Sequence, residues 1–495
     1  RRGINPTLAL RTGSATTVTL GYEYFLDKRI ADRGIASQNG KPFAIDESTF
    51  FGDPNQSPTD TELNTTSLSI DHDFGAGLSL RNRTLYGSYD KFYQNVYASG
   101  PVAANGTLPF QAYFAATDRQ NLFNQTDLVY KLKTGTIGHT LLGGVELGRQ
   151  LTDNFRLSGQ FADGSDADSN PDSTFVGNVS NPTINEPLVG FVQGSSDGNN
   201  ESVTTIAAIY AQDQISLTPQ FDAVIGLRYD QYRTEFNNRR SGVADADREI
   251  NTDDGLLSPR LGLIYKPVEQ ASIYASYSLS YLPRAGEQLG SLTPTNAAFD
   301  PEEYSNYEVG AKWDIQPALS LTLAVYQLDR RNVILPPINT GDASTLGDGA
   351  RTKGIELGVS GKLTKAWSVS GGYAYQDGKL TGTTNATTAR AGASLANLAR
   401  NTFSLWNRYD FTPQWGAGLG LFNRSATFAT TSNAVKLDGY TRLDGAVFYT
   451  VSPALSVQLN VENLTGEEYI VNAHTDNNLQ PGAPLNFRVG LTARF

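Results

Sequence analysis

Aromatic and basic side chains are the residues of this sequence whose types and grouping best suit chemistry with a small molecule. They gather in two segments that we expect to be loops, and one further arginine follows a predicted strand. Arginine binds anions through charge-assisted hydrogen bonds, and aromatic rings stack on planar groups and attract cations. This combination predicts a site for an anionic ligand with aromatic faces. The candidate residues are Phe43, Phe50, Phe51, Tyr93, Tyr97, Phe110, Tyr113, Phe114, Arg119 and Arg284.

A structural role is the competing interpretation for part of this set. Tyr and Phe are enriched at the water boundaries of membrane-spanning barrels, which suits Tyr93, Tyr97 and Tyr281 as well as ligand binding does. The formal net charge of −11 gives no long-range attraction for an anion, so any attraction must come from local basic side chains. The same charge argues against nucleic acid as a partner.

Residue types that usually carry catalysis are sparse or scattered. The three histidines, His72, His139 and His474, show no metal-ligand spacing, and the chain has no cysteine for a structural zinc site or thiol chemistry. No serine occupies a G-x-S-x-G elbow between a predicted strand and a predicted helix. We therefore expect no enzyme, no resident metal and no cofactor.

Alternation of apolar and polar side chains is the dominant pattern along the chain. Residues 485–495 place six apolar side chains on one face and polar, basic or glycine residues on the other, and 272–281 and 455–462 alternate in the same way. Period two over this length indicates a strand. No stretch of about 18 apolar residues could form a membrane-spanning helix. A transmembrane β-barrel needs only every second residue to face lipid.

Connections between these strands alternate between short and long. The short ones carry turn residues, as in 75–77, 218–219, 316–317, 412–413 and 452–453. A soluble sandwich also alternates within its strands, but it has no reason to place every long connection at one end. We therefore predict an antiparallel transmembrane barrel with periplasmic turns and extracellular loops. The predicted loops are 28–62, 98–118, 153–201, 236–255, 282–303, 336–350, 378–400, 426–438 and 470–484.

The number of strands carries a geometric consequence. We count about nineteen, the first near 4–10 and the last ending at Phe495. With an odd number, the first and last strands run in the same direction and cannot pair as antiparallel neighbours, so we expect an odd number of strands before Arg1. Polar residues on the strands are expected to face the lumen and pair there, because arginine facing lipid costs roughly 2–4 kcal/mol. They include Arg228, Asp230, Arg442, Asp444, Arg488 and Arg494.

Short motifs spaced along about half of the chain point to one family. Near the C-terminus they are Tyr440-Thr-Arg-Leu-Asp444 and Leu459-Asn-Val-Glu-Asn-Leu464, followed by the terminal Phe495. Upstream lie Ser258-Pro-Arg-Leu-Gly-Leu-Ile-Tyr-Lys-Pro267 and Arg351-Thr-Lys-Gly-Ile-Glu-Leu357. In this order, the motifs resemble the barrel portion of TonB-dependent outer-membrane receptors, which import ferric siderophores.

A subgroup resemblance comes from the first third of the chain. Gly3-Ile-Asn-Pro-Thr-Leu8, Ser48-Thr-Phe-Phe-Gly52 and Ser69-Ile-Asp-His-Asp-Phe74 are similar to the catecholate-type siderophore receptors. The family resemblance implies an all-β barrel of 22 strands, an N-terminal plug domain and a contact with TonB. We interpret residues 1–495 as the C-terminal part of such a barrel, with the plug and first strands not in this sequence.

The resemblance implies an active importer of ferric siderophores in the bacterial outer membrane, with iron present only as part of the bound siderophore. The siderophore would be of the catecholate type, and TonB would act through the N-terminal region. One alternative is a passive porin, since an unplugged barrel of this size is a wide pore. Another is a TonB-dependent receptor for a different large solute, such as a cobalamin, haem or glycan. Haem is disfavoured because only His474 lies in a predicted external loop.

Overall fold

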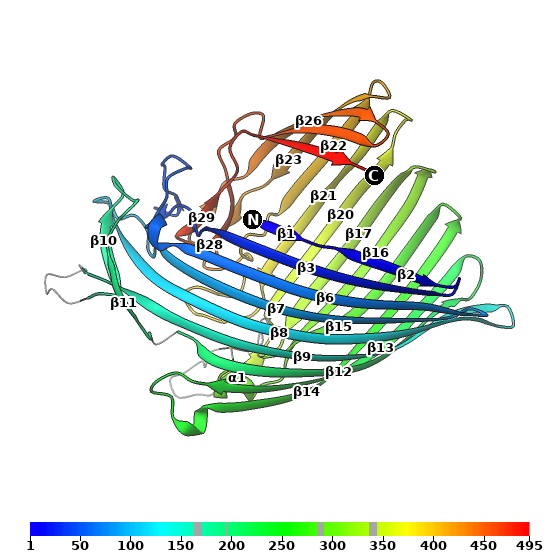
Figure 1. Cartoon of the computed structure of the whole chain (residues 1–495), viewed down its shortest axis with the longest axis horizontal. Coiled ribbons are helices and arrows are strands. Elements are labelled where there is room, and N and C mark those ends of the chain that lie inside the picture. The colour runs from blue at the N-terminus through cyan, green and yellow to red at the C-terminus, as the bar shows by residue number, and fades with distance from the viewer. Residues whose placement is uncertain (163–170, 195–196, 285–291, 336–343, 495) are drawn as a thin grey trace.

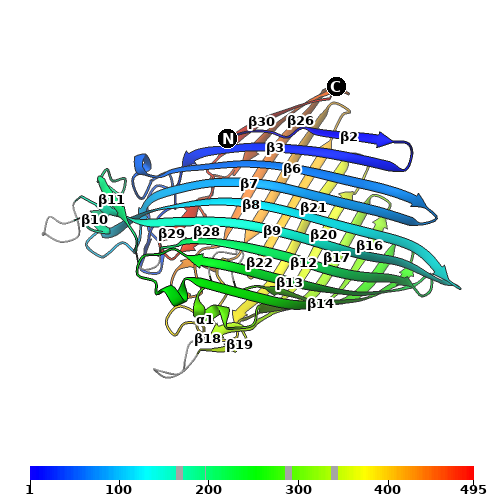
Figure 2. The same cartoon turned by 60° about the horizontal axis from the view of Figure 1, so that its bottom comes forward.

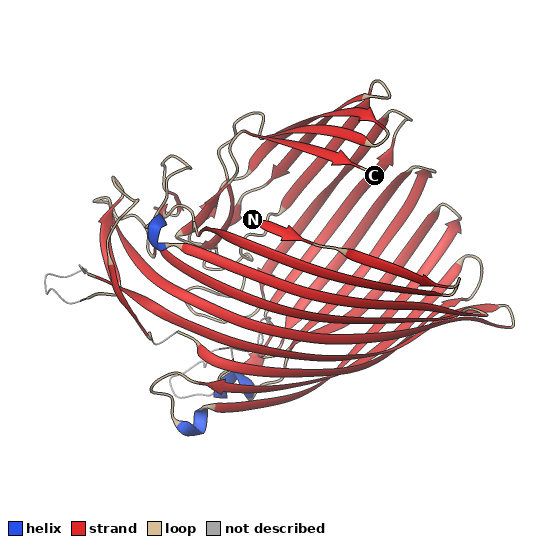
Figure 3. Cartoon of the chain, in the orientation of Figure 1, coloured by secondary structure: helices blue, strands red, loops and turns tan. Residues whose placement is uncertain are grey.

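The protein is built almost entirely from one large antiparallel sheet that curves into an incomplete cylinder (Figures 1 and 3). The computed structural model describes the chain except for residues 163–170, 195–196, 285–291, 336–343 and 495. The strands of the main sheet are β1 (Arg2–Ile4), β2 (Thr7–Thr12), β3 (Thr16–Ile30), β6 (Pro58–Gly75), β7 (Leu78–Ala98), β8 (Thr107–Thr134), β9 (Ile137–Phe161), β10 (Thr174–Asn178), β11 (Leu188–Val192), β12 (Asn199–Ser216), β13 (Phe221–Asn238), β14 (Glu249–Val268), β15 (Ala271–Leu282), β16 (Glu302–Gln316), β17 (Leu319–Arg331), β20 (Ala350–Lys362), β21 (Trp367–Leu380), β22 (Asn401–Asp410), β23 (Trp415–Arg424), β26 (Tyr440–Ser452), β27 (Leu455–Glu462) and β30 (Asn486–Ala493).

Smaller elements lie in the long connections at one end of the sheet. They are the strand pairs β4 (Ser37–Gln38) with β5 (Lys41–Pro42), β18 (Val333–Leu335) with β19 (Thr345–Gly347), β24 (Thr427–Phe428) with β25 (Lys436–Leu437), and β28 (Ile470–Thr475) with β29 (Asn478–Pro481), and the short helices η1 (Pro54–Gln56), η2 (Asp245–Asp247) and α1 (Pro294–Ala297). Within the described ranges, no helix has the length and apolar character needed to cross a membrane.

The predicted strand number and direction are confirmed. The main sheet has 22 strands in the described part of the chain. β1 and β2 pair with successive parts of β3, so they form one strand interrupted at Asn5 and Pro6, where proline has no N–H for the ladder. β10 and β11 are short additions to β8 and β9, which leaves nineteen strands in series. Both the first strand and β30 run toward the short-turn end, and the described residues show no pairing between them.

The connections also follow the predicted division into turns at one end and loops at the other (Figure 2). Several predicted loops are nevertheless shorter than expected. Residues 98–118 were expected to be one loop, yet β8 begins at Thr107 and leaves only 99–106 between strands. Likewise, β9 continues to Phe161 and β6 starts at Pro58. The ladders persist beyond the lipid belt because strand pairing, once begun, still satisfies the backbone in water.

The outward face is apolar and exposed, as membrane contact requires. On β30, Phe487, Val489 and Leu491 are 67%, 70% and 68% exposed, while Arg488 and Gly490 lie on the opposite face. Near the short turns, aromatic side chains form a belt around the outer face, as they do at the membrane–water interface of other barrels. They include Trp313, Trp367, the pair Phe221–Tyr265 and the pair Trp415–Tyr449.

Charged residues on the inward face pair with one another, as predicted, around Arg228 and Arg442. Arg228 lies 2.7 Å from Asp230 and 3.1 Å from Glu146, and Arg442 lies 2.8 Å from both Asp444 and Glu462. Paired charges in the lumen avoid the cost of an isolated charge in lipid.

Tyrosine rings lie flat against this inner wall where the neighbouring strand carries glycine. A β-carbon at Gly310 would come within 2.4 Å of the Tyr274 ring, and one at Gly354 within 2.5 Å of the Tyr326 ring. The Tyr274 hydroxyl donates to Glu308 at 2.6 Å, two residues along the strand from its glycine. Glycine at these positions is therefore a steric requirement of the ring above it.

A hydrophobic core ties the long loops together at the extracellular end. Phe51 from the first loop, Phe110 from β8 and Leu479 from β29 are almost fully buried in one cluster. The backbone of Ile35 bridges to Leu479, so the first and last loops are joined although they are far apart in sequence. This core positions the side chains described next.

Candidate ligand-binding site

Two overlapping cavities of about 640 and 390 Å³ lie where the long loops meet the inner face of β7, β8 and β9. The β28–β29 hairpin lies at the loop end of these strands (Figure 1). The Asn478 side chain at its turn donates to the Ala98 carbonyl at 3.0 Å. We call the two cavities together the arginine–tyrosine pocket. Its defining residues are Arg33, Tyr93, Tyr97, Tyr113, Arg156 and His474.

Strand alternation brings three tyrosines together in this pocket. Tyr93 and Tyr97 lie on the same face of β7, and Tyr113 on β8 stands opposite Asn95, between them. The Tyr113 ring centre is 5.7 Å from that of each of the other two. Offset and edge contacts at this separation are the favoured geometries of aromatic pairs. The result is a phenol-rich wall that faces the space above the lumen.

Two guanidinium groups lie against these rings. The Arg156 guanidinium is 3.9 Å from the Tyr113 ring centre, and that of Arg33 is 4.6 Å from Tyr97 and 5.5 Å from Tyr113. Arg156 also lies 3.0 Å from the buried carboxylate of Asp197, which fixes its position. Among the described residues, no carboxylate comes within 4.0 Å of the Arg33 guanidinium, so its charge is available to a ligand.

His474 is the other polar neighbour of Arg33. A nitrogen of the Arg33 guanidinium lies 3.2 Å from Nδ1 of His474. Burial, and secondly the positive charge of Arg33, hold the pKa of His474 below its usual value. The imidazole is therefore neutral near pH 7 and accepts from the guanidinium, which holds Arg33 between a ring nitrogen and the tyrosine faces.

Another part of the pocket lining is rich in hydroxyl groups. Thr430 and Ser432 donate to the two carboxylate oxygens of Asp476 at 2.9 and 2.8 Å. Thr431 donates to the Thr388 carbonyl at 3.0 Å and so ties two loops together. This wall offers hydrogen bonds and one negative charge.

The structure separates the residues that the sequence proposed for ligand binding. Tyr93, Tyr97 and Tyr113 line the pocket together. Phe51 and Phe110 are 2% and 0% exposed within the loop core, so their role in this conformation is packing.

The other proposed residues lie elsewhere. Phe43 packs against the loop core, and the carbonyl of Phe50 accepts from Thr183. Phe114 follows Tyr113 on β8 and therefore points to the outer face, where it contacts Phe92, Phe155 and Phe191.

The two proposed arginines outside the pocket are both engaged. Arg119 lies further down the inner wall, with its Nε donating to Thr152 at 3.1 Å. Arg284 is 9% exposed, donates to the Asn332 carbonyl and lies 3.6 Å from Glu302. Neither is among the described residues that line the two cavities.

Sequence reasoning missed Arg33, Arg156 and His474 as partners of one site. Arg156 shares its strand parity with Glu146, which faces the lumen, so alternation could have indicated its face. Arg33 and His474 lie 441 residues apart, and only the docking of the first loop on the last one joins them.

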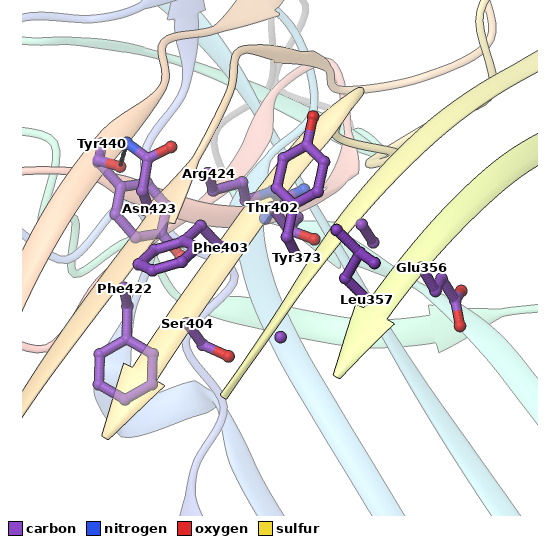
Figure 4. Close-up of a pocket in the computed structure, with 12 residues that line it drawn as sticks. Glu356, Leu357, Tyr373, Thr402, Phe403, Ser404, Phe422, Asn423, Arg424 and Tyr440 are labelled. Atoms are coloured by element: carbon purple, nitrogen blue, oxygen red, sulfur yellow. Dashed lines mark hydrogen bonds between the residues drawn. The ribbon is translucent and has the colours of Figure 1, made fainter. Parts of the chain in front are cut away.

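Another hollow, of about 430 Å³, lies against β20 to β26 (Figure 4). Its aromatic lining includes Phe403 and Phe422, but its charged groups are already engaged. The Arg424 guanidinium donates to the carbonyls of Val471 and Asn397. Glu356 is hydrogen-bonded to Tyr326. The arginine–tyrosine pocket is therefore the better candidate for a charged ligand.

A cylinder of strands with an apolar outer belt, a charged lumen and a pocket among its long loops defines an outer-membrane receptor. Residues 4–464 match the family model described as "TonB dependent receptor-like, beta-barrel". The chain therefore belongs to the TonB-dependent receptor family and is an outer-membrane protein.

Individual relatives agree with this assignment. The chain is similar to the probable TonB-dependent siderophore receptor PiuA of Acinetobacter baumannii, with 26% identity across 96% of this chain and 67% of that protein. It is 28% identical to the metal-pseudopaline receptor CntO of Pseudomonas aeruginosa, across 99% of this chain and 68% of CntO. The closed-form crystal structure of the ferric-catecholate import receptor Fiu of E. coli K12 shares the fold, with a TM-score of 0.84 and 24% identity over 100% of this chain and 74% of Fiu.

Proposed function

We propose that this chain forms the barrel of a receptor that imports ferric siderophores, with the catecholate type as the preferred ligand. The supporting observation is the placement of the Arg33 and Arg156 guanidiniums against the ring of Tyr113. An iron–catecholate complex is anionic and presents aromatic faces. Guanidiniums bind such groups by charge-assisted hydrogen bonds, and phenol rings add stacking contacts. Relatives named as siderophore receptors, such as PiuA, support the same ligand class.

In this proposal the iron is cargo and not a resident cofactor, and the energy for transport comes through TonB. The pocket lies above the lumen, so a bound chelate would wait at the extracellular end of the barrel until the lumen opens. The inner wall of the barrel carries paired charges. These polar groups could contact a domain that occupies the lumen.

Deletion of the gene tests the proposal in the source bacterium under iron limitation. Uptake of radioactive iron would be measured with a panel of ferric siderophores, in strains with and without TonB. We expect the deletion to abolish TonB-dependent uptake of at least one ferric catecholate. Unchanged uptake across the panel would contradict the proposal.

Planar-bilayer conductance of the natural protein separates the receptor from a passive porin. A receptor is expected to remain nearly closed, whereas a porin would show a large steady conductance. A steady open pore in the natural protein would favour the porin.

A further inference from the structure

Two charged side chains that line the arginine–tyrosine pocket, Arg33 and Asp476, have no oppositely charged partner within the described residues. Among the described residues, neither the Arg33 guanidinium nor the Asp476 carboxylate has an oppositely charged group within 4.0 Å. Both line the same cavity of about 640 Å³. They do not form an ion pair with one another, so each is left to a ligand or to solvent.

The cationic wall suits the metal-binding end of a chelate. Arg33 is held between His474 and the tyrosine rings, and Arg156 is held by Asp197, so both guanidiniums are in place before a ligand arrives. Preorganised donors lose less conformational freedom on binding than free side chains do.

The part of the lining around Asp476 suits a positively charged or strongly donating group. The Asp476 carboxylate receives two hydroxyl hydrogen bonds, from Thr430 and Ser432. A carboxylate has about four acceptor positions, so the two that remain can accept from an ammonium group. A purely anionic ligand in this cavity would instead be repelled by Asp476.

We propose that the pocket binds an amphoteric iron chelate, an inference that rests on the proposed function. Its anionic metal-binding groups lie on Arg33 and Arg156, and its protonated amine lies on Asp476. The substrate class is therefore a ferric chelate with a free amine, and a uniformly anionic chelate is a poorer ligand.

The test compares two ferric complexes whose ligands differ only in one amine. The probes are the iron(III) complexes of N-(2-aminoethyl)-2,3-dihydroxybenzamide and of its N-acetyl derivative, titrated into the natural full-length receptor. We expect the free-amine complex to bind about tenfold more tightly, a typical effect of one charge-assisted hydrogen bond. Asp476→Asn should remove this preference and bind the acetylated complex at least as tightly as the natural receptor does, because the repulsion is removed as well. That binding also shows that the variant is folded.

Asp438→Asn is the matched control, because Asp438 is an exposed carboxylate of the neighbouring loop that does not line the pocket. This variant should keep the preference for the free amine. Equal affinity of the natural receptor for the two complexes, or a preference that survives in Asp476→Asn, would overturn the inference while leaving siderophore import intact. Failure of the receptor to bind any ferric chelate would overturn the proposed function as well.

Discussion

The inner and outer faces of β7, β8 and β9 have opposite character beyond the lipid belt. The inner face carries the arginine–tyrosine pocket. On the outer face, Asp90, Asp118 and Asp153 stand directly opposite one another on the three strands, and Glu62 and Glu201 continue the row onto β6 and β12. Five carboxylates therefore lie in register across five neighbouring strands. Like charges in this arrangement destabilise a sheet.

Aromatic residues show the same division between the two faces. Tyr113 contacts two tyrosines and two guanidiniums on the inside. Phe114, the next residue, contacts three phenylalanine rings on the outside, at ring separations of 5.0 to 5.8 Å. Side-chain parity, and not membership of a loop, therefore decides which residues of this region can meet a ligand.

Loss of the two pocket arginines should give the largest effect. Arg33→Gln is expected to lower the affinity for a ferric tricatecholate about tenfold or more, because a hydrogen bond to a charged group contributes about 1.5–3 kcal/mol. Adding Arg156→Gln should bring the loss to more than about a hundredfold. Arg149→Gln, on the exposed outer face of β9, is the control and should bind normally. A comparable loss of affinity in the control, measured by the same titration, would show that the pocket is not the binding site.

Substitution of two neighbouring residues on β8 separates the role of the inner face from that of the outer face. Tyr113→Ala should weaken ligand binding about fivefold, since it removes the ring that both guanidiniums contact and cation–π contacts contribute about 0.5–2 kcal/mol. Phe114→Ala should leave the affinity unchanged and lower the unfolding temperature instead, because its ring packs against three others on the outer face. Affinity and thermal unfolding are measured on both variants, and a reversal of the two outcomes would refute the assignment of faces.

The pH dependence of binding should depend on His474. Its pKa is lowered in the free receptor, and a bound anion would raise it, so binding takes up a proton. Affinity should therefore increase as the pH falls below the ordinary histidine pKa of about 6.5. His474→Gln should lose this increase, and the ratio of natural to variant affinity cancels protonation of the chelate itself. A ratio that stays constant between pH 7.5 and 5.5 would exclude the effect.

The acidic row should give the smallest effect, and one of opposite sign. Asp118→Asn is expected to stabilise the sheet by about 0.2–1 kcal/mol, because it relieves repulsion from Asp90, whereas Asp153 is already paired with Arg239 at 2.8 Å. The gain, measured as the unfolding temperature, should shrink at high salt. Asp60→Asn is the matched control, since Asp60 is paired with Lys28 at 2.5 Å and its loss should not stabilise. A lower unfolding temperature for Asp118→Asn would contradict this account of the row.

The fold was largely predictable because lipid imposes a strict rule on alternate residues. The strand number, the direction of the first and last strands and the inward placement of Arg228 and Arg442 all follow from that rule. Above the lipid the rule lapses, since both faces there mix polar and apolar residues. Tyr93 and Phe114 were therefore assigned to a loop, although both lie on strands.

The candidate site was predictable only in part. Tyr93, Tyr97 and Tyr113 were identified from their types and spacing, and the structure brings them together. Arg33 and His474 meet only because the first and last long loops dock on a shared hydrophobic core. Contacts of that kind depend on the packing of distant segments, which local patterns do not contain.

The flat tyrosines of the lumen wall have a consequence for the passage of material. Because each ring lies against a glycine, it takes up little of the lumen, which is therefore wide at these positions. A methyl group at Gly310 or Gly354 would force its partner ring to turn away from the wall and occupy the channel. Single glycine-to-alanine changes could therefore narrow the conduit from within while leaving the pocket above it untouched.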